Sequence, residues 1–119
     1  MLIFRVIKRI FWKKSLDKKS CKKYTCFLDK LENKTPKIQI IEYDKIYHHI
    51  LKDLGYTGSF GEILKRNPKE ITNIDTVWSL HKLRNSLVHE LGEKNADFLT
   101  KSAREYKGAV KLFLKEVSK

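Results

Sequence analysis

The sequence predicts an all-α protein, a four-helix-type bundle with an additional basic N-terminal helix or hairpin. Three observations lead to this fold class. Apolar residues recur at intervals of three and four along the long segments, residues that cap helices precede those segments, and no segment alternates apolar and polar residues as a strand would. The length of 119 residues and the hydrophobic content of 41% fit one folded domain with a single core.

Residues 1–35 are predicted to be a basic amphipathic appendage to a helical domain at residues 36–119. Residues 1–37 contain 12 Lys or Arg and 3 Asp or Glu, whereas residues 38–119 contain 14 and 11. Within residues 1–14, basic side chains interrupt the apolar run, which argues against both a transmembrane helix and a signal peptide. A basic amphipathic helix here could bind an anionic membrane surface, an RNA backbone or a groove on the same protein. The alternative is a first helix that docks on the domain with its lysines in water.

The first helices of the domain are predicted from their caps. Thr35 is a good N-cap with Pro36 at the first helical position, and the apolar pattern continues until Gly55. Ser59–Glu62 has the sequence of a capping box, which predicts a short helix that stops before Pro68.

Two further helices complete the predicted bundle. Thr72 or Asn73 would cap the first of them, which would run to about residues 91–92 with a core-facing apolar stripe of Leu80, Leu83, Leu87 and Leu91. The last helix, residues 95–117, shows the same three-four spacing at Leu99, Ala103, Tyr106, Val110, Phe113 and Val117. We expect the two longest helices of the bundle to be antiparallel.

The run Leu83–Glu90 places side chains suited to phosphate chemistry on the third of these helices. Asn85 and His89 are one turn apart, and Arg84 lies on the neighbouring stripe with His81. Histidine can act as acid or base near neutral pH, arginine offers a forked cation that matches phosphate oxygens, and asparagine can orient either one. Cleavage of RNA by its own 2′-hydroxyl needs these functions, and a symmetric dimer would supply a histidine for each proton transfer. The alternative is that Arg and His simply stabilise the C-terminal end of the helix.

The run WSLHKLRNSLVHE resembles the signature of HEPN domains, whose ribonuclease members carry Arg-x(4 to 6)-His, commonly with Asn after the Arg. Arg84, Asn85 and His89 match this motif. The preceding segment, IIEYDKIYHHILKDLGYTGSFGEILKRNP, is also similar to small bacterial HEPN-like proteins. The resemblance implies a metal-independent endoribonuclease that acts as a homodimer, often as a toxin paired with an antitoxin or as a defence effector. It equally allows a member that only binds RNA or mediates protein contacts.

Further residues could join this site. The resemblance implies an acidic or polar residue from the first core helix, which makes Glu42 and Asp44 candidates, with solvated surface carboxylates as the alternative. His81 and Lys82 border the motif and could hold phosphates. Glu90 could orient His89 or be an ordinary surface carboxylate.

The net charge of +12 favours polyanionic partners, RNA above all, although the same charge could merely keep a small protein soluble. The predicted nucleic-acid-binding residues are lysines of the N-terminal region, namely Lys13, Lys14, Lys18, Lys19, Lys22 and Lys23. Cys21 and Cys26 have the spacing of neither a redox pair nor a zinc finger, so we predict reduced thiols and no metal or cofactor. We expect a cytoplasmic protein, with peripheral association at a membrane through residues 1–14 as an open alternative.

Overall fold

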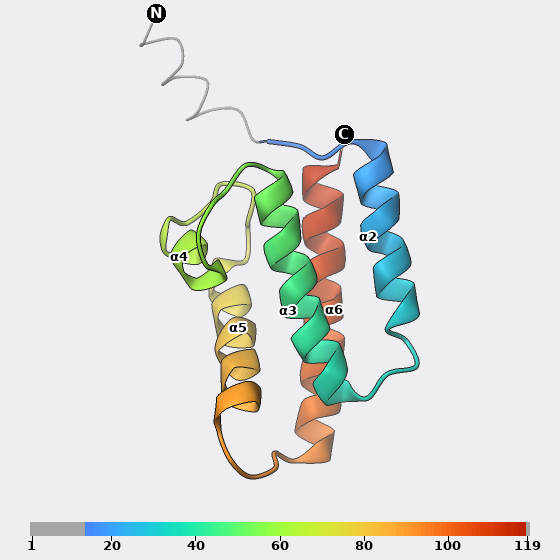
Figure 1. Ribbon diagram of the computed structural model, residues 1–119, viewed down its shortest axis with the longest axis vertical. Coiled ribbons are helices and arrows are strands. Elements are labelled where there is room, and N and C mark those ends of the chain that lie inside the picture. Colours follow the sequence, from blue (N-terminus) through green and yellow to red (C-terminus); the bar gives the residue numbers. More distant parts are fainter. Residues whose placement is uncertain (1–13, 119) are drawn as a thin grey trace, which may run out of the picture.

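In the computed structural model, residues 14–118 are described, and they form a bundle of five α-helices (Figure 1). The helices are α2 (Lys18–Lys30), α3 (Pro36–Asp53), α4 (Phe60–Lys65), α5 (Ile74–His89) and α6 (Ala96–Val117). Within residues 14–118 there is no strand, so the all-α prediction is confirmed. None of the helices in this part of the chain is both long and apolar enough to cross a lipid bilayer. The amphipathic helix predicted at residues 1–14 lies outside the described residues, apart from Lys14.

The predicted caps at Thr35 and Ser59 are formed, whereas Asn73 precedes α5 without a side-chain hydrogen bond to it. The side chain of Thr35 accepts a hydrogen bond from the Ile38 N–H at the start of α3, and Asn95 accepts one from the Phe98 N–H at the start of α6. At α4 both hydrogen bonds of the predicted capping box are present, and they lower the pKa of the Glu62 carboxyl. These local signals are confirmed because a cap is satisfied by residues three positions away and needs no tertiary contact.

The core lies mainly between α3 and α6, which run in the same direction, while α5 runs opposite to both (Figure 1). Two ring pairs show the shared direction: Tyr43 contacts Tyr106 at a centroid distance of 6.3 Å, and Tyr47 stacks on Phe113 at 4.4 Å. The prediction that the two longest helices are antiparallel is therefore wrong. Between α3 and α6 the chain reverses direction twice, once before α5 and once after it, so α6 runs in the same direction as α3.

Helix α2 shares this core although it lies within the basic N-terminal region. Asp17 caps it, and Tyr24 and Leu28 are buried on its inner side. The preceding residue Leu16 is also buried, and its N–H donates to the Val117 carbonyl oxygen at 2.7 Å. Residues 16–31 are thus packed on the bundle.

The C-terminal end of α5 is shorter than the apolar pattern predicts. The helix ends at His89, and a loop with Gly92 at φ +99° connects it to α6. Leu80 is buried and Leu83 and Leu87 are half-buried, as expected for a core-facing stripe. Leu91 is fully exposed, so its assignment to that stripe is wrong, because the helix that would have turned it inward has already ended.

Candidate functional site

The candidate site is built around α5, whose first half is held firmly by its neighbours. Val77, Leu80 and His81 are the buried residues of this helix. They face α3, α4 and α6, so the motif residues that follow on the same face come close to side chains of α3. His81 is only 8% exposed, with its ring packed against Phe60 at a centroid distance of 4.7 Å.

A buried carboxylate on α3 receives donors from two other helices. Asp44 is 4% exposed, and its Oδ2 lies 2.9 Å from Nδ1 of His81 and 2.7 Å from the hydroxyl of Tyr106. Its Oδ1 lies 3.6 Å from Nε of Arg84, an ion pair rather than a hydrogen bond at this distance. Asp44 is therefore not a solvated surface carboxylate, which corrects that alternative. It is buried because it faces α5 and α6, where two hydrogen-bond donors and the Arg84 cation compensate for its lost hydration.

The contacts continue from Arg84 around a closed circuit. Nη1 of Arg84 donates to Oδ1 of Asn85 at 3.0 Å, and Nδ2 of Asn85 lies 3.5 Å from Nε2 of His81. The circuit returns through His81 Nδ1 to Asp44, which faces Arg84 with its other oxygen. If Nδ1 of His81 donates to Asp44, Nε2 can accept from the Asn85 amide. Nε of Arg84 is buried and has no hydrogen-bond partner among the described residues, so it faces Asp44 only as an ion pair.

Tyr106 is a member of this cluster that the sequence did not single out. Burial and the nearby Asp44 carboxylate raise its pKa, so its hydroxyl stays protonated and donates to Asp44. The signal in the sequence was a tyrosine in the apolar stripe of the last helix, where its hydroxyl needs a partner inside the core.

His89, the third motif residue, is separate from this circuit. It is the last residue of α5, its side chain is exposed, and it forms no hydrogen bond or ion pair with another residue in the range 14–118. Glu90 forms an ion pair with Lys94 at 3.6 Å, and it forms no hydrogen bond or ion pair with His89 in the described part of the chain. The structure thus brings Arg84 and Asn85 together and leaves His89 on the surface one turn further along.

The remaining candidates differ in their surroundings. His81 borders the motif through Asn85, as predicted, but its ring is buried and Nδ1 already contacts Asp44. Lys82 is exposed, with its Nζ 5.7 Å from the centre of the half-buried Trp78 ring. Glu42 is half-buried and pairs with Lys45 at 3.6 Å.

The predicted lysines lie mostly on the surface of α2. Lys18, Lys19 and Lys22 are exposed, and Lys23 is exposed beside Asp53 at 3.9 Å. Lys14 precedes the helix, and its backbone N–H donates to the buried Glu70. Lys13 lies outside the described residues.

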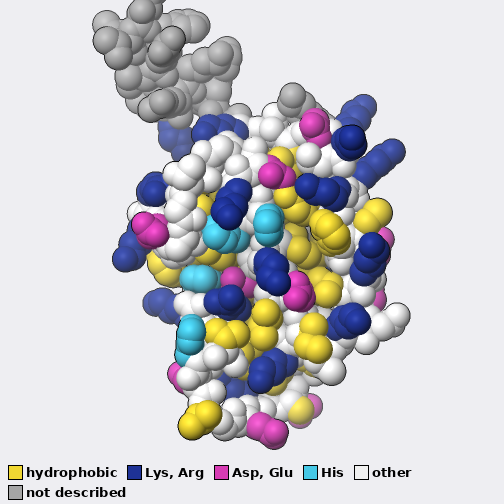
Figure 2. Space-filling model, viewed as in Figure 1, with side chains coloured by type: hydrophobic (Ala, Val, Ile, Leu, Met, Phe, Trp, Pro, Cys, Tyr) yellow, Lys and Arg dark blue, Asp and Glu magenta, His cyan; other side chains and the backbone are white. Residues whose placement is uncertain are grey.

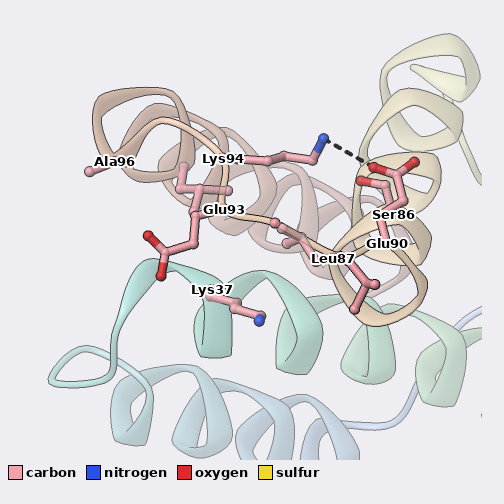
Figure 3. Close-up of a pocket in the computed structure, with 10 residues that line it drawn as sticks. Lys37, Ser86, Leu87, Glu90, Glu93, Lys94 and Ala96 are labelled. Atoms are coloured by element: carbon pink, nitrogen blue, oxygen red, sulfur yellow. Dashed lines mark ion pairs between the residues drawn. The ribbon is translucent and has the colours of Figure 1, made fainter.

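A pocket of about 380 Å³ lies where α5 ends and α6 begins (Figure 3). Its lining includes Lys37, Ser86, Leu87, Glu90 and Lys94, with the Glu90–Lys94 ion pair at one side. At about 100° per residue, Ser86 and Leu87 project from a different face of α5 than the buried His81. The pocket therefore does not contain the Arg84 circuit.

Residues 14–118 contain no group of three or more His, Cys, Asp or Glu side chains placed to hold a metal ion. Cys21 lies 3.1 Å from the Ser118 hydroxyl, and Cys26 is exposed; both are free thiols. Comparison of the chain with models of known protein families, with curated proteins and with solved structures finds no significant match.

Proposed function

We propose that this chain is a metal-independent endoribonuclease of the HEPN type, in which Arg84 binds phosphate and His89 transfers protons. The observation that carries the proposal is the circuit around Arg84. Nη1 of the guanidinium donates to Asn85, and Nε lies 3.6 Å from Asp44 without a hydrogen bond, while the Nη2 N–H groups form no hydrogen bond with other residues in the described range. The side chain is 31% exposed, so these N–H groups are available to phosphate oxygens.

The proposed reaction needs one base and one acid. The base removes the proton of the 2′-hydroxyl, whose oxygen attacks the neighbouring phosphorus as the bond from phosphorus to the 5′-oxygen breaks. The acid gives a proton to that leaving oxygen, and the products carry a 2′,3′-cyclic phosphate and a 5′-hydroxyl. Arg84 would stabilise the negative charge that builds up on the phosphoryl oxygens. A neutral and a protonated histidine can fill the two proton-transfer roles near pH 7.

One chain offers a single exposed histidine in the motif, so the proposal includes a dimer. Val88 and Leu91 flank His89, and both are exposed large hydrophobic residues. Val88 also follows Arg84 by one turn, on the stripe that His81 and Asn85 share. A second copy that covers these apolar side chains would bring two His89 rings to one site. Roles as a toxin or defence effector, with an antitoxin as partner, rest on the family resemblance alone.

A non-catalytic module that binds RNA or a protein is the second candidate. One observation favours it. A catalytic histidine usually has a hydrogen-bond partner that sets its tautomer, and His89 has none within residues 14–118. In this case Arg84 and the lysines would supply affinity without turnover.

The test is cleavage of labelled RNA by purified protein in EDTA, with analysis of the product ends. We expect cyclic phosphate ends, a rate per chain that rises over the concentration range in which dimers form, and a loss of about 10²- to 10⁴-fold in His89→Ala. His89→Gln is the matched variant, because it keeps a polar side chain that cannot exchange protons near neutral pH. Equal cleavage by wild type and His89→Gln would refute the acid–base role, and no cleavage by a folded, dimeric wild type would favour the second candidate.

A further inference from the structure

A second surface, on the α2 side of α3, combines cations with an exposed aromatic ring. Here α2 and α3 form a groove of about 430 Å³ whose floor is mainly apolar, with Phe27, Leu31 and Ile46 among its lining residues. Lys23, Lys30 and Lys45 line the same groove. In Figure 2 hydrophobic side chains lie between Lys and Arg side chains over α2 and α3.

The spacing on α2 explains this combination. Lys23, Phe27 and Lys30 are four and three residues apart, so they share one stripe of the helix. The Phe27 ring is 43% exposed, although burial of a phenylalanine is strongly favourable, and the Lys30 Nζ lies 5.9 Å from its centre. The core takes Tyr24 and Leu28 from this helix instead. Packing within the bundle therefore does not account for Phe27.

We infer that this groove binds single-stranded RNA, with a base stacked on Phe27 and the backbone phosphates near Lys23, Lys30 and Lys45. Sites for single strands combine a basic groove with aromatic rings, since every base offers a flat face and every nucleotide a negative charge. A duplex hides those base faces, so charge alone would attract it. Two of the three lysines have acidic neighbours, since Lys45 lies 3.6 Å from Glu42 and Lys23 lies 3.9 Å from Asp53. Both ion pairs are partly exposed and therefore weak, so phosphate oxygens can replace the carboxylates.

This inference rests on the proposed ribonuclease function, and it names the form of RNA that the enzyme would take. Helix α3 connects the two surfaces, because Asp44 contacts Arg84 on one side while Lys45 and Ile46 line the groove on the other. A strand held in the groove would thus lie on the same bundle as the motif and could reach it across α3 (Figure 1).

The experiment measures the affinity of His89→Ala protein for a labelled oligouridine of about 12 nucleotides, a length within the range of single-strand sites. Phe27→Ala should weaken binding by about fivefold or more, and Phe27→Leu should weaken it comparably because leucine cannot stack. Phe98→Ala is the matched control, since Phe98 on α6 is 48% exposed and lies outside the groove. Replacing the three lysines by glutamine should lower the slope of log affinity against log salt by about 2.

Three results would overturn the inference. They are equal effects of Phe27→Ala and Phe98→Ala, full affinity in Phe27→Leu, and equal affinity for an RNA duplex of the same length. Full affinity in Phe27→Leu would show that stacking on the Phe27 ring does not contribute to RNA binding. Because binding is measured with a variant that should not cleave RNA, its result does not depend on the cleavage experiment. The ribonuclease proposal and the groove proposal can therefore fail separately.

Discussion

The two halves of α5 differ in what holds their functional side chains. In the first half, His81 is fixed by its contact with Asp44 from another helix, and Arg84, one turn later, faces the same carboxylate. In the last turn, Val88 and His89 project into solvent, while Leu87 of the same turn packs against the core. The comparison teaches that the fold itself positions the proposed phosphate-binding group. The proposed proton-transfer group must be positioned by something added later, such as a second copy or the substrate.

Because of this difference, we expect substitutions at the two places on α5 to change different properties, stability near Asp44 and cleavage at the exposed end. Substitutions in the Asp44 cluster should change the free energy of unfolding, because they leave buried polar groups without partners. Substitutions at the exposed end should change cleavage while the bundle remains as stable as before.

The largest effect is expected for Asp44→Ala. It removes the acceptor of His81 and Tyr106 and the counter-charge of Arg84, and breaking a buried charge pair typically costs about 3 to 5 kcal/mol. Urea unfolding followed by circular dichroism measures the change. Glu42→Ala on the same helix is the control and should cost less than about 1 kcal/mol, since its ion pair with Lys45 is partly exposed. Similar losses in both variants would show that the contacts of Asp44 contribute no more to the free energy of unfolding than the exposed Glu42–Lys45 pair.

A smaller loss is expected for Tyr106→Phe, which deletes one hydrogen bond to the Asp44 carboxylate and should cost about 1.5 to 3 kcal/mol. Tyr47→Phe is the matched control. Its buried hydroxyl has no hydrogen-bond partner among the described residues, so its removal should be neutral or stabilising.

The same pair gives a pH dependence. Burial raises the pKa of Tyr106 above the ordinary value of 10.0, so its contribution to stability is complete below pH 10 and is lost as the unfolded chain ionises at higher pH. The stability difference between wild type and Tyr106→Phe should therefore shrink above pH 10. A difference that stays constant to pH 11 would contradict the raised pKa.

The smallest change in stability is expected for His89→Ala, which should stay within about 0.5 kcal/mol of wild type because the side chain is exposed. His81→Ala, two turns earlier in the same helix, should cost at least about 1 kcal/mol because it leaves the Asp44 carboxylate short of a donor. Comparable losses at both positions would remove the contrast between the two halves of α5.

Local sequence signals predicted most of the fold. The caps at Thr35 and Ser59 were predicted correctly because each depends on residues within one helical turn. The packing of α2 and the shared direction of α3 and α6 were not predicted, since apolar spacing shows that a helix has a buried face and not which neighbour covers it.

The candidate site was predictable only in part for the same reason. Arg84 and Asn85 are adjacent in sequence, and their contact follows from the helix. The burial of Asp44 depends on Tyr106, which is 62 residues away, and on the order in which the helices pack. A carboxylate among apolar helix positions was the available clue, and the sequence alone left it open whether that carboxylate was solvated.

Leu16 and Val117 meet through a backbone hydrogen bond at one end of the bundle, and the C-terminal end of α5 with His89 lies at the opposite end (Figure 1). Both ends of the described unit therefore leave the bundle side by side, as in domains that tolerate insertion into other chains. A fluorescent protein or an affinity handle joined after Ser118 would begin at the end of the bundle opposite to His89. Such fusions could report on pairing of two copies without occupying the surface through which we propose they meet.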